Sequence, residues 1–340
     1  MRVGVMGATG YTGHELLRLL RGHPEAETVF LGSAAHVGAD IREIYPGLPG
    51  QWPTLRAEET PAVDILFCAL PSGTTAARAG RFLAAGIKVI DLSADFRLRD
   101  AAEYEAWYGL RHPAPDLLEE AVYGLPEFYR ADISAARLVA NPGCYPTAAL
   151  LALRPLLQAG LLEASSLIID AASGVSGAGR TVAADYLFSE INENYKPYGV
   201  GVHRHTPEIE QELSLAAGQA LRVSFTPHLL PITRGILATI YARPAPGVSE
   251  ADLRRSWEEA YADESFVLPL PPGVWPQTKF AAASNYVFLQ LRLDERTGRV
   301  VIAAAIDNLV RGAAGQAVQN MNLMLGRPER LGLEQAGLWP

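Results

Sequence analysis

Short apolar runs alternate with helical stripes over the first 140 residues. Continuous apolar runs are typical of strands that are buried on both faces of a parallel sheet, and they occur at 2–6, 27–31, 62–70 and 86–91. Helices are expected between these runs, one with a leucine face at 14–21 and one reaching Leu83. Because crossovers between parallel strands are right-handed, we expect a doubly wound parallel sheet.

After residue 144 the pattern changes to strands with few helices between them. A turn at 294–298 joins two alternating runs and predicts a hairpin, and one amphipathic helix is expected at 250–261. The sequence therefore predicts an α+β domain with a mixed or antiparallel sheet. Its expected strands are 166–172, 221–226, 235–242, 285–293 and 299–305.

The chain closes with a helix rich in small residues, expected at 308–325. Small residues permit close packing, so we expect this helix to return to the first domain. The predicted domains are 1–143 with 308–340, and 144–307.

A glycine motif follows the first strand and opens the first helix. Its spacing is G-x-x-G-x-x-G, and strand–loop–helix is the context in which such glycines bind a dinucleotide pyrophosphate. A plain tight turn is the alternative. With this motif the first domain is expected to be of the Rossmann type, and polar positions after later strands should face the same crevice. The expected cofactor contacts are Gly7, Thr9, Gly10, Tyr11, Thr12, Gly13, Ser33, Pro71 and Ser93.

The second strand ends without the carboxylate that usually binds the ribose of NAD. Ser33, His36 and Arg42 follow it instead and could favour a 2′-phosphate. We therefore expect NADP, although His36 and Arg42 taken singly are nearly as well explained as ordinary loop residues.

Cys144 lies in the stretch Asn141-Pro-Gly-Cys-Tyr-Pro-Thr-Ala148, ahead of a buried helix. Pro146 suits the first helical position, which places Cys144 at a helix N-terminus. The positive end of the helix dipole favours a thiolate, the form that attacks carbonyl carbon. A small buried cysteine in a turn is the alternative. We expect Cys144 to be a nucleophile if a base lies nearby.

Two further segments of the second domain carry polar chemistry. The glycine and serine loop from Ser173 through Gly174 to Arg180 could bind an anion with its backbone N–H groups. His203, Arg204 and His205 stand ahead of another predicted helix. No third ligand stands at a convincing spacing, so we expect no metal; a histidine is instead the expected base for a cysteine nucleophile.

Composition restricts the possible partners and compartment. The 340 residues carry a formal net charge of −8, which argues against nucleic acid or an anionic membrane as partner. Only two cysteines occur, and no apolar run approaches the roughly 20 residues that span a bilayer. We expect a cytoplasmic protein.

Together, a dinucleotide domain, a nucleophilic cysteine and a histidine indicate one reaction class. In that class an acyl group is transferred to the sulfur and the thioester is reduced by a nicotinamide, or a thiohemiacetal on the sulfur is oxidised.

The sequence resembles the N-acetyl-γ-glutamyl-phosphate reductases of arginine biosynthesis and, more distantly, the aspartate-semialdehyde dehydrogenases. The segments that carry the resemblance are 7–13, 89–97, 123–127, 141–148, 173–180, 203–209, 227–235 and 304–312. The resemblance implies an acyl phosphate substrate, Cys144 as nucleophile and His203 as the acid–base. It also implies that the closing helix belongs to the cofactor domain.

Other expected site residues come with this resemblance. Substrate contacts are expected from Ser173, Gly174, Arg180, Arg204, His205 and Arg234, and further cofactor contacts from Ser176, Gly177 and Asn308. The chain departs from the family at Ser72, where the family often has histidine. We expect a homodimer or homotetramer.

Two rival interpretations remain at this stage. One is a related reductase of lysine biosynthesis, which uses an aminoadipyl phosphate attached to a small acidic carrier protein. The other is a non-enzymatic NADP-binding sensor. A sensor needs neither Cys144 nor the histidine pair, and a chain at −8 is a poor partner for an acidic carrier.

Overall fold

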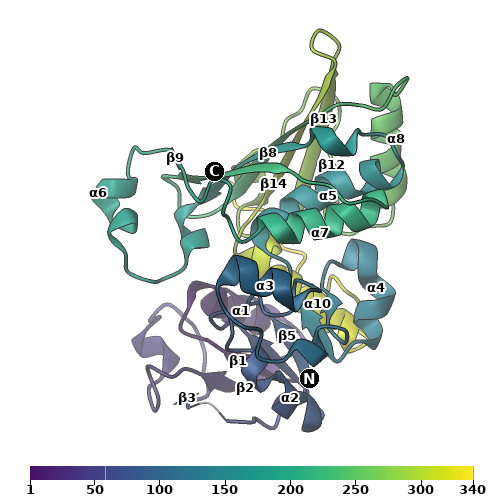
Figure 1. Cartoon of the computed structure of the whole chain (residues 1–340). Coiled ribbons are helices and arrows are strands. Elements are labelled where there is room, and N and C mark those ends of the chain that lie inside the picture. Colours follow the sequence, from purple (N-terminus) through teal and green to yellow (C-terminus); the bar gives the residue numbers. More distant parts are fainter. Residues whose placement is uncertain (58, 340) are drawn as a thin grey trace. The chain divides into compact units, whose positions relative to one another are not determined.

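The chain enters the first of two units, leaves it and returns near its end. The computed structural model describes residues 1–57 and 59–339. The first unit contains Met1–Pro142 and Ala313–Gln335, and the second contains Gly143–Gly312 and the chain from Ala336 onward. Each unit has its own sheet (Figure 1).

This division differs from the sequence-based boundaries at three places, the first being Gly143, which lies with the second unit. Residues 308–312 lie with the second unit because the Gly312 N–H bonds to the carbonyl of Asp307, at the end of a strand there. The end of the chain lies with the second unit because the Leu338 N–H donates to the carbonyl of Ala282.

All strands of the first sheet are parallel, as the apolar runs predicted. The sheet order is β3-β2-β1-β4-β5-β7-β6. Strands β2 and β3 extend the sheet on one side of β1, and the later strands extend it on the other, which puts a topological switch point at the carboxyl ends of β1 and β4. The doubly wound Rossmann-type sheet is confirmed. Its strands are β1 (Arg2–Met6), β2 (Glu27–Gly32), β3 (Leu55–Arg56), β4 (Ile65–Cys68), β5 (Lys88–Asp91), β6 (Val122–Tyr123) and β7 (Leu138–Ala140).

The helices of the first unit cover this sheet with apolar faces. Helix α1 buries the leucine face predicted for it, and α10 packs on α1, α4 and β5. Asn320 of α10 donates to the carbonyl of Gly124 and to Oδ1 of Asn141. The helices are α1 (Tyr11–Gly22), α2 (Ala76–Ala84), α3 (Ala101–Tyr108), α4 (Pro126–Ala135) and α10 (Gly315–Met324), with 3₁₀ turns at Ile41–Glu43 and Pro115–Leu117.

The second sheet is mixed, and its order is β12-β13-β14-β11-β8-β10-β9. Strands β8 and β10 pair in parallel, as do β12 and β13, while the other pairs are antiparallel. The strands are β8 (Ile168–Gly174), β9 (Lys196–Pro197), β10 (Ser224–Leu230), β11 (Ile236–Ala242), β12 (Val267–Pro269), β13 (Val287–Asp294) and β14 (Arg299–Ile306).

The strand predicted at 221–226 is displaced along the chain. It begins at Ser224 and continues through Pro227 to Leu230. Proline lacks a backbone N–H. The neighbouring β9 pairs only with His228 and Leu229, so Pro227 interrupts no ladder hydrogen bond with β9.

Helices cover one face of the second sheet. Helix α5 contacts β11 and β14 and packs on α7 and α8 (Figure 1), and α8 also contacts β12 and β13. Helix α8 begins at a capping box between Ser249 and Asp252, and its Trp257 donates to the carbonyl of Ala152 in α5. The helices are α5 (Cys144–Gln158), α6 (Phe188–Ile191), α7 (Thr206–Ala217), α8 (Glu250–Tyr261) and α9 (Thr278–Ala281), with 3₁₀ turns at Ala164–Ser166, Val175–Ala178 and Ala184–Tyr186.

The closing helix predicted at 308–325 is shorter than expected. A π-helical turn, Val310–Ala314, precedes α10, because the Gly312 N–H bonds five residues back to Asp307. Among the described residues, no helix has the length and apolar character needed to cross a bilayer.

Candidate active site

The glycine motif forms a tight turn between β1 and α1 in the first unit. Gly7 has φ +75°, and a Cβ there would lie 2.1 Å from the carbonyl oxygen of Ala69. A Cβ at Gly13 would lie 2.2 Å from the Gly7 oxygen. Gly10 is the N-cap of α1 and has no side chain over the first helical N–H groups. The turn therefore leaves a bare helix N-terminus of the kind that binds pyrophosphate.

The predicted 2′-phosphate residues lie after β2. Ser33 is buried, and its Oγ lies 3.4 Å from Oγ1 of Thr9 in the glycine turn. Arg42 forms a forked ion pair with Asp40, and the hydrogen bonds from Arg42 lower the pKa of Asp40 to about 2. Arg42 is therefore engaged by a carboxylate in this structure, and Ser33 is the predicted residue placed beside the glycine turn.

Asp95 connects the turns that follow β4 and β5. Its buried carboxylate accepts hydrogen bonds from the N–H of Gly73 at 2.6 Å, the N–H of Ala76 at 2.9 Å and the hydroxyl of Tyr104 at 2.9 Å. The loop that contains Pro71 and Ser72 is thereby fixed to the loop after β5.

Asp91, the last residue of β5, lies in the same buried region. Its carboxylate accepts hydrogen bonds from the backbone N–H of Ser93 at 3.1 Å and from the Ser93 hydroxyl at 2.8 Å. Burial and the neighbouring charge of Asp95 raise the pKa of Asp91 to about 6. The hydroxyl of Ser93 is thus engaged within its own turn.

Cys144 is the first residue of α5, two residues earlier than Pro146 suggested. Helix α5 continues because Thr147 donates both its N–H and its hydroxyl to the Gly143 carbonyl, each at 2.9 Å. The Gly143 N–H in turn donates to the buried carboxylate of Glu208 at 2.8 Å. Cys144 is partly exposed, so the sulfur is held at a rigid helix start that ligands can reach.

His203 lies in an aromatic setting in the second unit. Its ring meets those of Tyr145, Tyr198 and Phe225 edge-on, with centroids 5.6, 5.3 and 5.4 Å away. Burial and then the charge of Arg204 lower the pKa of His203 to about 4. Its Nδ1 accepts the N–H of His205 at 3.0 Å, so the neutral ring carries its proton on Nε2.

His205 lies against the residue before the cysteine. A Cβ built on Gly143 would come within 2.6 Å of Nε2 of His205. His205 is also the N-cap of α7, the helix that carries Glu208. One helix start therefore brings both a histidine and a carboxylate to Gly143.

The predicted anion-binding residues form a second cluster within the same unit. Gly174 permits the backbone of Arg234 to approach, since a Cβ at 174 would lie 2.7 Å from the Arg234 nitrogen. Asn308 accepts from the Gly235 N–H at 2.7 Å and donates to Oγ of Ser176 at 2.9 Å. Gly177 packs on the hydroxyl of Ser173.

Arg180 and Arg204 have a different setting. Both are exposed, on the loop after β8 and beside His203 respectively. The structure brings Ser173, Gly174, Ser176, Asn308 and Arg234 into one cluster, whereas Arg180 and Arg204 are exposed to solvent.

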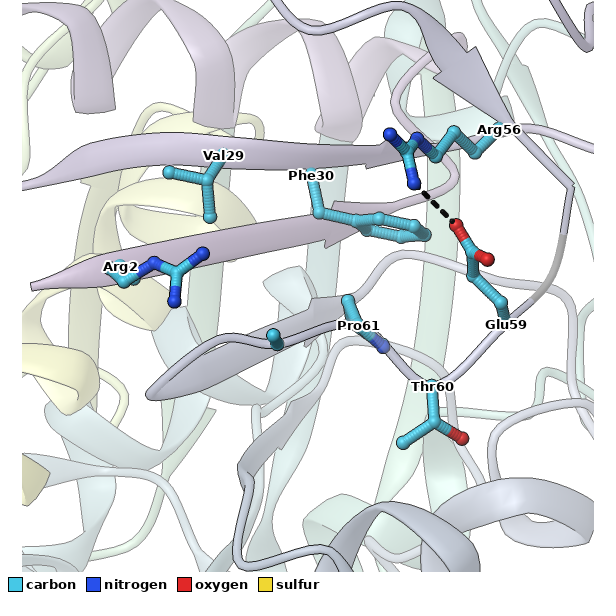
Figure 2. A pocket seen from close by; sticks show the side chains of 8 residues that line it. Arg2, Val29, Phe30, Arg56, Glu59, Thr60 and Pro61 are labelled. Carbon is cyan, nitrogen blue, oxygen red and sulfur yellow. Dashed lines mark hydrogen bonds and ion pairs between the residues drawn. The ribbon is translucent and has the colours of Figure 1, made fainter.

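In the first unit, a hollow of about 250 Å³ lies away from the glycine turn (Figure 2). Arg2, at the start of β1, lines it, whereas the glycine turn follows the other end of that strand. Arg56 and Glu59 form an ion pair of 3.2 Å at its wall. None of the predicted site residues is among those lining it.

Sequence reasoning missed three residues of the second unit that hold the site. They are Glu208, Asp307 and Gly312, which contact Gly143, Arg234 and Cys144 respectively. All three lie in segments 203–209 and 304–312, which carry the family resemblance. Their contacts could not be predicted because their partners are distant in the chain.

Family comparisons agree with both units. Residues 2–136 match a family model described as semialdehyde dehydrogenase, NAD binding domain, and residues 144–308 match one described as semialdehyde dehydrogenase, dimerisation domain. Aspartate semialdehyde dehydrogenase II from Vibrio cholerae has a similar fold, with a TM-score of 0.71 and 18% identity over 96% of this chain and 98% of that one. The Candida albicans enzyme, solved with NADP, gives a TM-score of 0.67 at 18% identity, covering 95% and 98%. Fold and site define an NAD(P)-dependent oxidoreductase of the semialdehyde dehydrogenase class.

Sequence relatives narrow the class further. N-acetyl-gamma-glutamyl-phosphate reductase from Moorella thermoacetica is 53% identical over the whole of both chains, and that from Symbiobacterium thermophilum is 54% identical over 99% of this chain and 98% of its own. The chain belongs to the N-acetyl-gamma-glutamyl-phosphate reductase family. The resemblance noted from the sequence motifs is confirmed.

Proposed function

We propose that this chain reduces N-acetyl-γ-glutamyl phosphate to N-acetylglutamate 5-semialdehyde with NADPH, in arginine biosynthesis. One observation carries the proposal. In a chain half identical to reductases of that name, Cys144 begins a buried helix and Nε2 of His205 lies against the preceding Gly143. A cysteine and a histidine held together at a helix start are suited to acyl transfer.

The first unit fits a nicotinamide dinucleotide. Gly7 and Gly13 clear the space that side chains would fill, and α1 begins directly beyond Gly10. In our proposal this turn holds the pyrophosphate, and Ser33 with Thr9 faces the adenosine ribose. The bound cofactor supplies the hydride.

Cys144 forms the covalent bond to substrate in this mechanism. The thiolate sulfur bonds to the γ-acyl carbon, the carbon–oxygen bond to phosphate breaks, and inorganic phosphate leaves with that electron pair. In our proposal, backbone N–H groups at the start of α5 stabilise the oxyanion. The product is a thioester on Cys144, which after reduction releases the aldehyde and restores the thiolate.

We assign the acid–base role to His205, in place of the His203 expected from the sequence. Nδ1 of His203 accepts a backbone N–H, and burial holds its pKa near 4, so His203 is a neutral ring at physiological pH. His205 lies against Gly143, the residue before the nucleophile, and in our proposal it takes the thiol proton. His203 then serves as an aromatic neighbour that fixes Tyr145 and His205.

Substrate binding is assigned to the cluster around Arg234. Its guanidinium pairs with carboxylates in a planar fork, and the Ser173–Ser176 loop offers backbone N–H groups beside it. We assign the substrate carboxylate to Arg234. Arg180 and Arg204, being exposed, attract the anionic substrate from solvent.

We also propose a homodimer formed through the second unit. Alternate residues of β11 are buried under the helices, and Leu237, Thr239 and Tyr241 remain partly exposed on the other face. The family model for this region carries dimerisation in its description. Sedimentation at the monomer mass of 36.6 kDa would contradict a dimer, and a mass four times larger would indicate the homotetramer. Both cysteines are free, which is consistent with the cytoplasmic location that we propose.

The decisive experiment measures the reaction in the oxidative direction. Purified protein is given N-acetylglutamate 5-semialdehyde, NADP and phosphate, and NADPH formation is followed. Phosphate-dependent NADPH formation supports the proposal. The carrier-linked aminoadipyl aldehyde is measured in parallel: a higher kcat/KM for it would favour the lysine-biosynthesis alternative, and no turnover with either aldehyde would favour a sensor.

A further inference from the structure

Asp307 is a fully buried acid directly after β14. Its Oδ1 accepts the N–H groups of Leu309 at 2.8 Å and Val310 at 3.0 Å. Its Oδ2 accepts the Ala283 N–H at 2.6 Å and lies 3.3 Å from Nη1 of Arg234. A buried carboxylate is costly unless it is paired and hydrogen-bonded, so this set of contacts needs a reason beyond packing.

The contact with Arg234 fixes a cation that the loop alone would leave mobile. Arg234 belongs to the connection between β10 and β11, and its side chain is 28% exposed. The backbone around it is already immobilised, because Gly174 packs on it and the following Gly235 donates to Asn308. The Asp307 carboxylate then holds one edge of the guanidinium, which reduces the number of side-chain rotamers that remain.

The same residue also reaches the nucleophile through its backbone. The Asp307 carbonyl accepts the Gly312 N–H at 2.9 Å and closes the π-helical turn. Gly312 lies on Cys144, since a Cβ at 312 would come within 2.6 Å of the Cys144 Cβ. One residue therefore contacts Arg234 with its side chain and supports the seat of Cys144 with its main chain.

We propose that Asp307 is a positioning residue that sets the place of the Arg234 guanidinium relative to Cys144. A substrate with a carboxylate at one end and an acyl phosphate at the other is thereby bound with its acyl carbon at the sulfur. This inference rests on the proposed function, because it takes Arg234 as the group that binds the substrate carboxylate. It defines the substrate class as acyl phosphates that carry a free carboxylate.

The test compares two aldehydes in the oxidative direction. N-acetylglutamate 5-semialdehyde carries the carboxylate, and 4-acetamidobutanal is the same molecule without it. Asp307→Asn preserves the shape and removes the charge, and it is expected to raise KM for the first aldehyde about ten- to hundredfold, the range for hydrogen bonds to charged groups. The kcat/KM for 4-acetamidobutanal is expected to fall much less, because this aldehyde has no carboxylate for Arg234 to bind.

A double-mutant cycle shows whether Asp307 acts through Arg234. Arg234→Ala should raise KM for the carboxylate substrate, and adding Asp307→Asn to it should raise KM no further. Asp294→Asn is the matched control, because Asp294 also forms an ion pair with an arginine, Arg296, but lies at the end of β13, beside the start of β14. It should leave both aldehydes unaffected.

The outcomes distinguish the positioning role of Asp307 from the assignment of the substrate carboxylate to Arg234. Equal losses with both aldehydes, or independent effects of Asp307→Asn and Arg234→Ala, would overturn the positioning role. An unchanged KM in Arg234→Ala would instead overturn the substrate assignment on which it rests. If Asp307→Asn does not fold, Asp307→Glu keeps the charge and moves it by one methylene; the same loss confined to the carboxylate substrate is expected, and its absence would overturn the role.

Discussion

Gly312 lies directly against Cys144. A Cβ at position 312 would stand 2.6 Å from the Cβ of Cys144 and 3.1 Å from its Cα. Real Cβ atoms do not approach so closely, so any side chain at 312 must move the start of α5. The π-helical turn that presents Gly312 is of a kind that often occurs at functional sites.

Gly312→Ala is therefore expected to lower kcat by about a hundredfold, the cost of displacing a reacting group by about 1 Å. The rate of Cys144 alkylation by iodoacetamide should change in the same variant. Gly80→Ala is the matched control, because Gly80 lies within α2 and a Cβ there would meet nothing within 4 Å. Wild-type kcat in Gly312→Ala would mean that the helix start can shift without consequence.

Cys144→Ser should abolish turnover and leave NADPH affinity nearly intact. The sulfur forms the covalent bond, whereas the cofactor is assigned to the glycine turn of the first unit, so kcat should fall by several powers of ten. Steady-state kinetics and NADPH fluorescence titration measure the two effects. Cys68→Ala is the comparison, since Cys68 is a fully buried core residue. A Cys144→Ser enzyme that retained about a tenth of the rate would place the nucleophile elsewhere.

The two histidines should respond differently to replacement. His205→Asn is expected to lower kcat/KM by about two to four powers of ten, the usual contribution of a general acid–base. It should also remove the limb of the pH–rate profile that the general acid–base produces. His203→Asn should keep that limb, because burial holds the pKa of His203 near 4. The reverse pattern would restore His203 as the acid–base.

NADP should be preferred to NAD. Strand β2 ends at Gly32 and is followed by Ser33, not by a carboxylate that would bind the 2′-hydroxyl and repel a 2′-phosphate. Comparison of kcat/KM for the two cofactors at saturating aldehyde measures the preference. A kcat/KM with NAD equal to or higher than that with NADP would contradict this prediction.

Asp91 should make the fold less stable as pH rises. Its pKa is about 6 in the folded chain against a usual 3.8, so between these pH values the folded state keeps a proton that the unfolded state has lost. Its stabilising contribution is complete below pH 3.8 and is lost as pH rises through 6. In urea unfolding, wild type should lose stability relative to Asp91→Asn across this window.

Asp294→Asn is the control, because Asp294 should change the pH dependence of stability in the opposite direction. The hydrogen bond from Thr297 lowers the pKa of Asp294, so the stability it contributes is lost as pH falls through that lowered pKa. Unfolding curves of wild type and Asp91→Asn that run parallel with pH would show that Asp91 does not carry the effect.

Much of the fold was predictable because it follows from local patterns. The strand at Arg2–Met6 and the helix at Glu250–Tyr261 lie where hydrophobic periodicity placed them. The glycine turn was equally readable, since Gly7 and Gly13 are needed by a turn within that same stretch. The hairpin of β13 and β14 followed from the turn residues between them.

The details of the site were less predictable because the sequence does not show which partner each polar side chain contacts. Nothing local distinguishes His205 from His203; the difference arises from Gly143, about sixty residues earlier in the chain. Arg42 was a reasonable phosphate ligand until the structure paired it with Asp40. The displaced start of the closing helix likewise depends on the side chain of Asp307, which holds the N–H groups of Leu309 and Val310.

The return of the chain to its first unit imposes an order on biosynthesis. Helix α10 fills the space beside α1, α4 and β5, yet it is translated after the whole of Gly143–Gly312. At about 5–20 residues per second, residues 1–142 therefore wait for roughly ten to thirty seconds without their last helix. During that interval the second unit, which is almost continuous in sequence, is translated, while the nascent first unit exposes the apolar surface that α10 later covers.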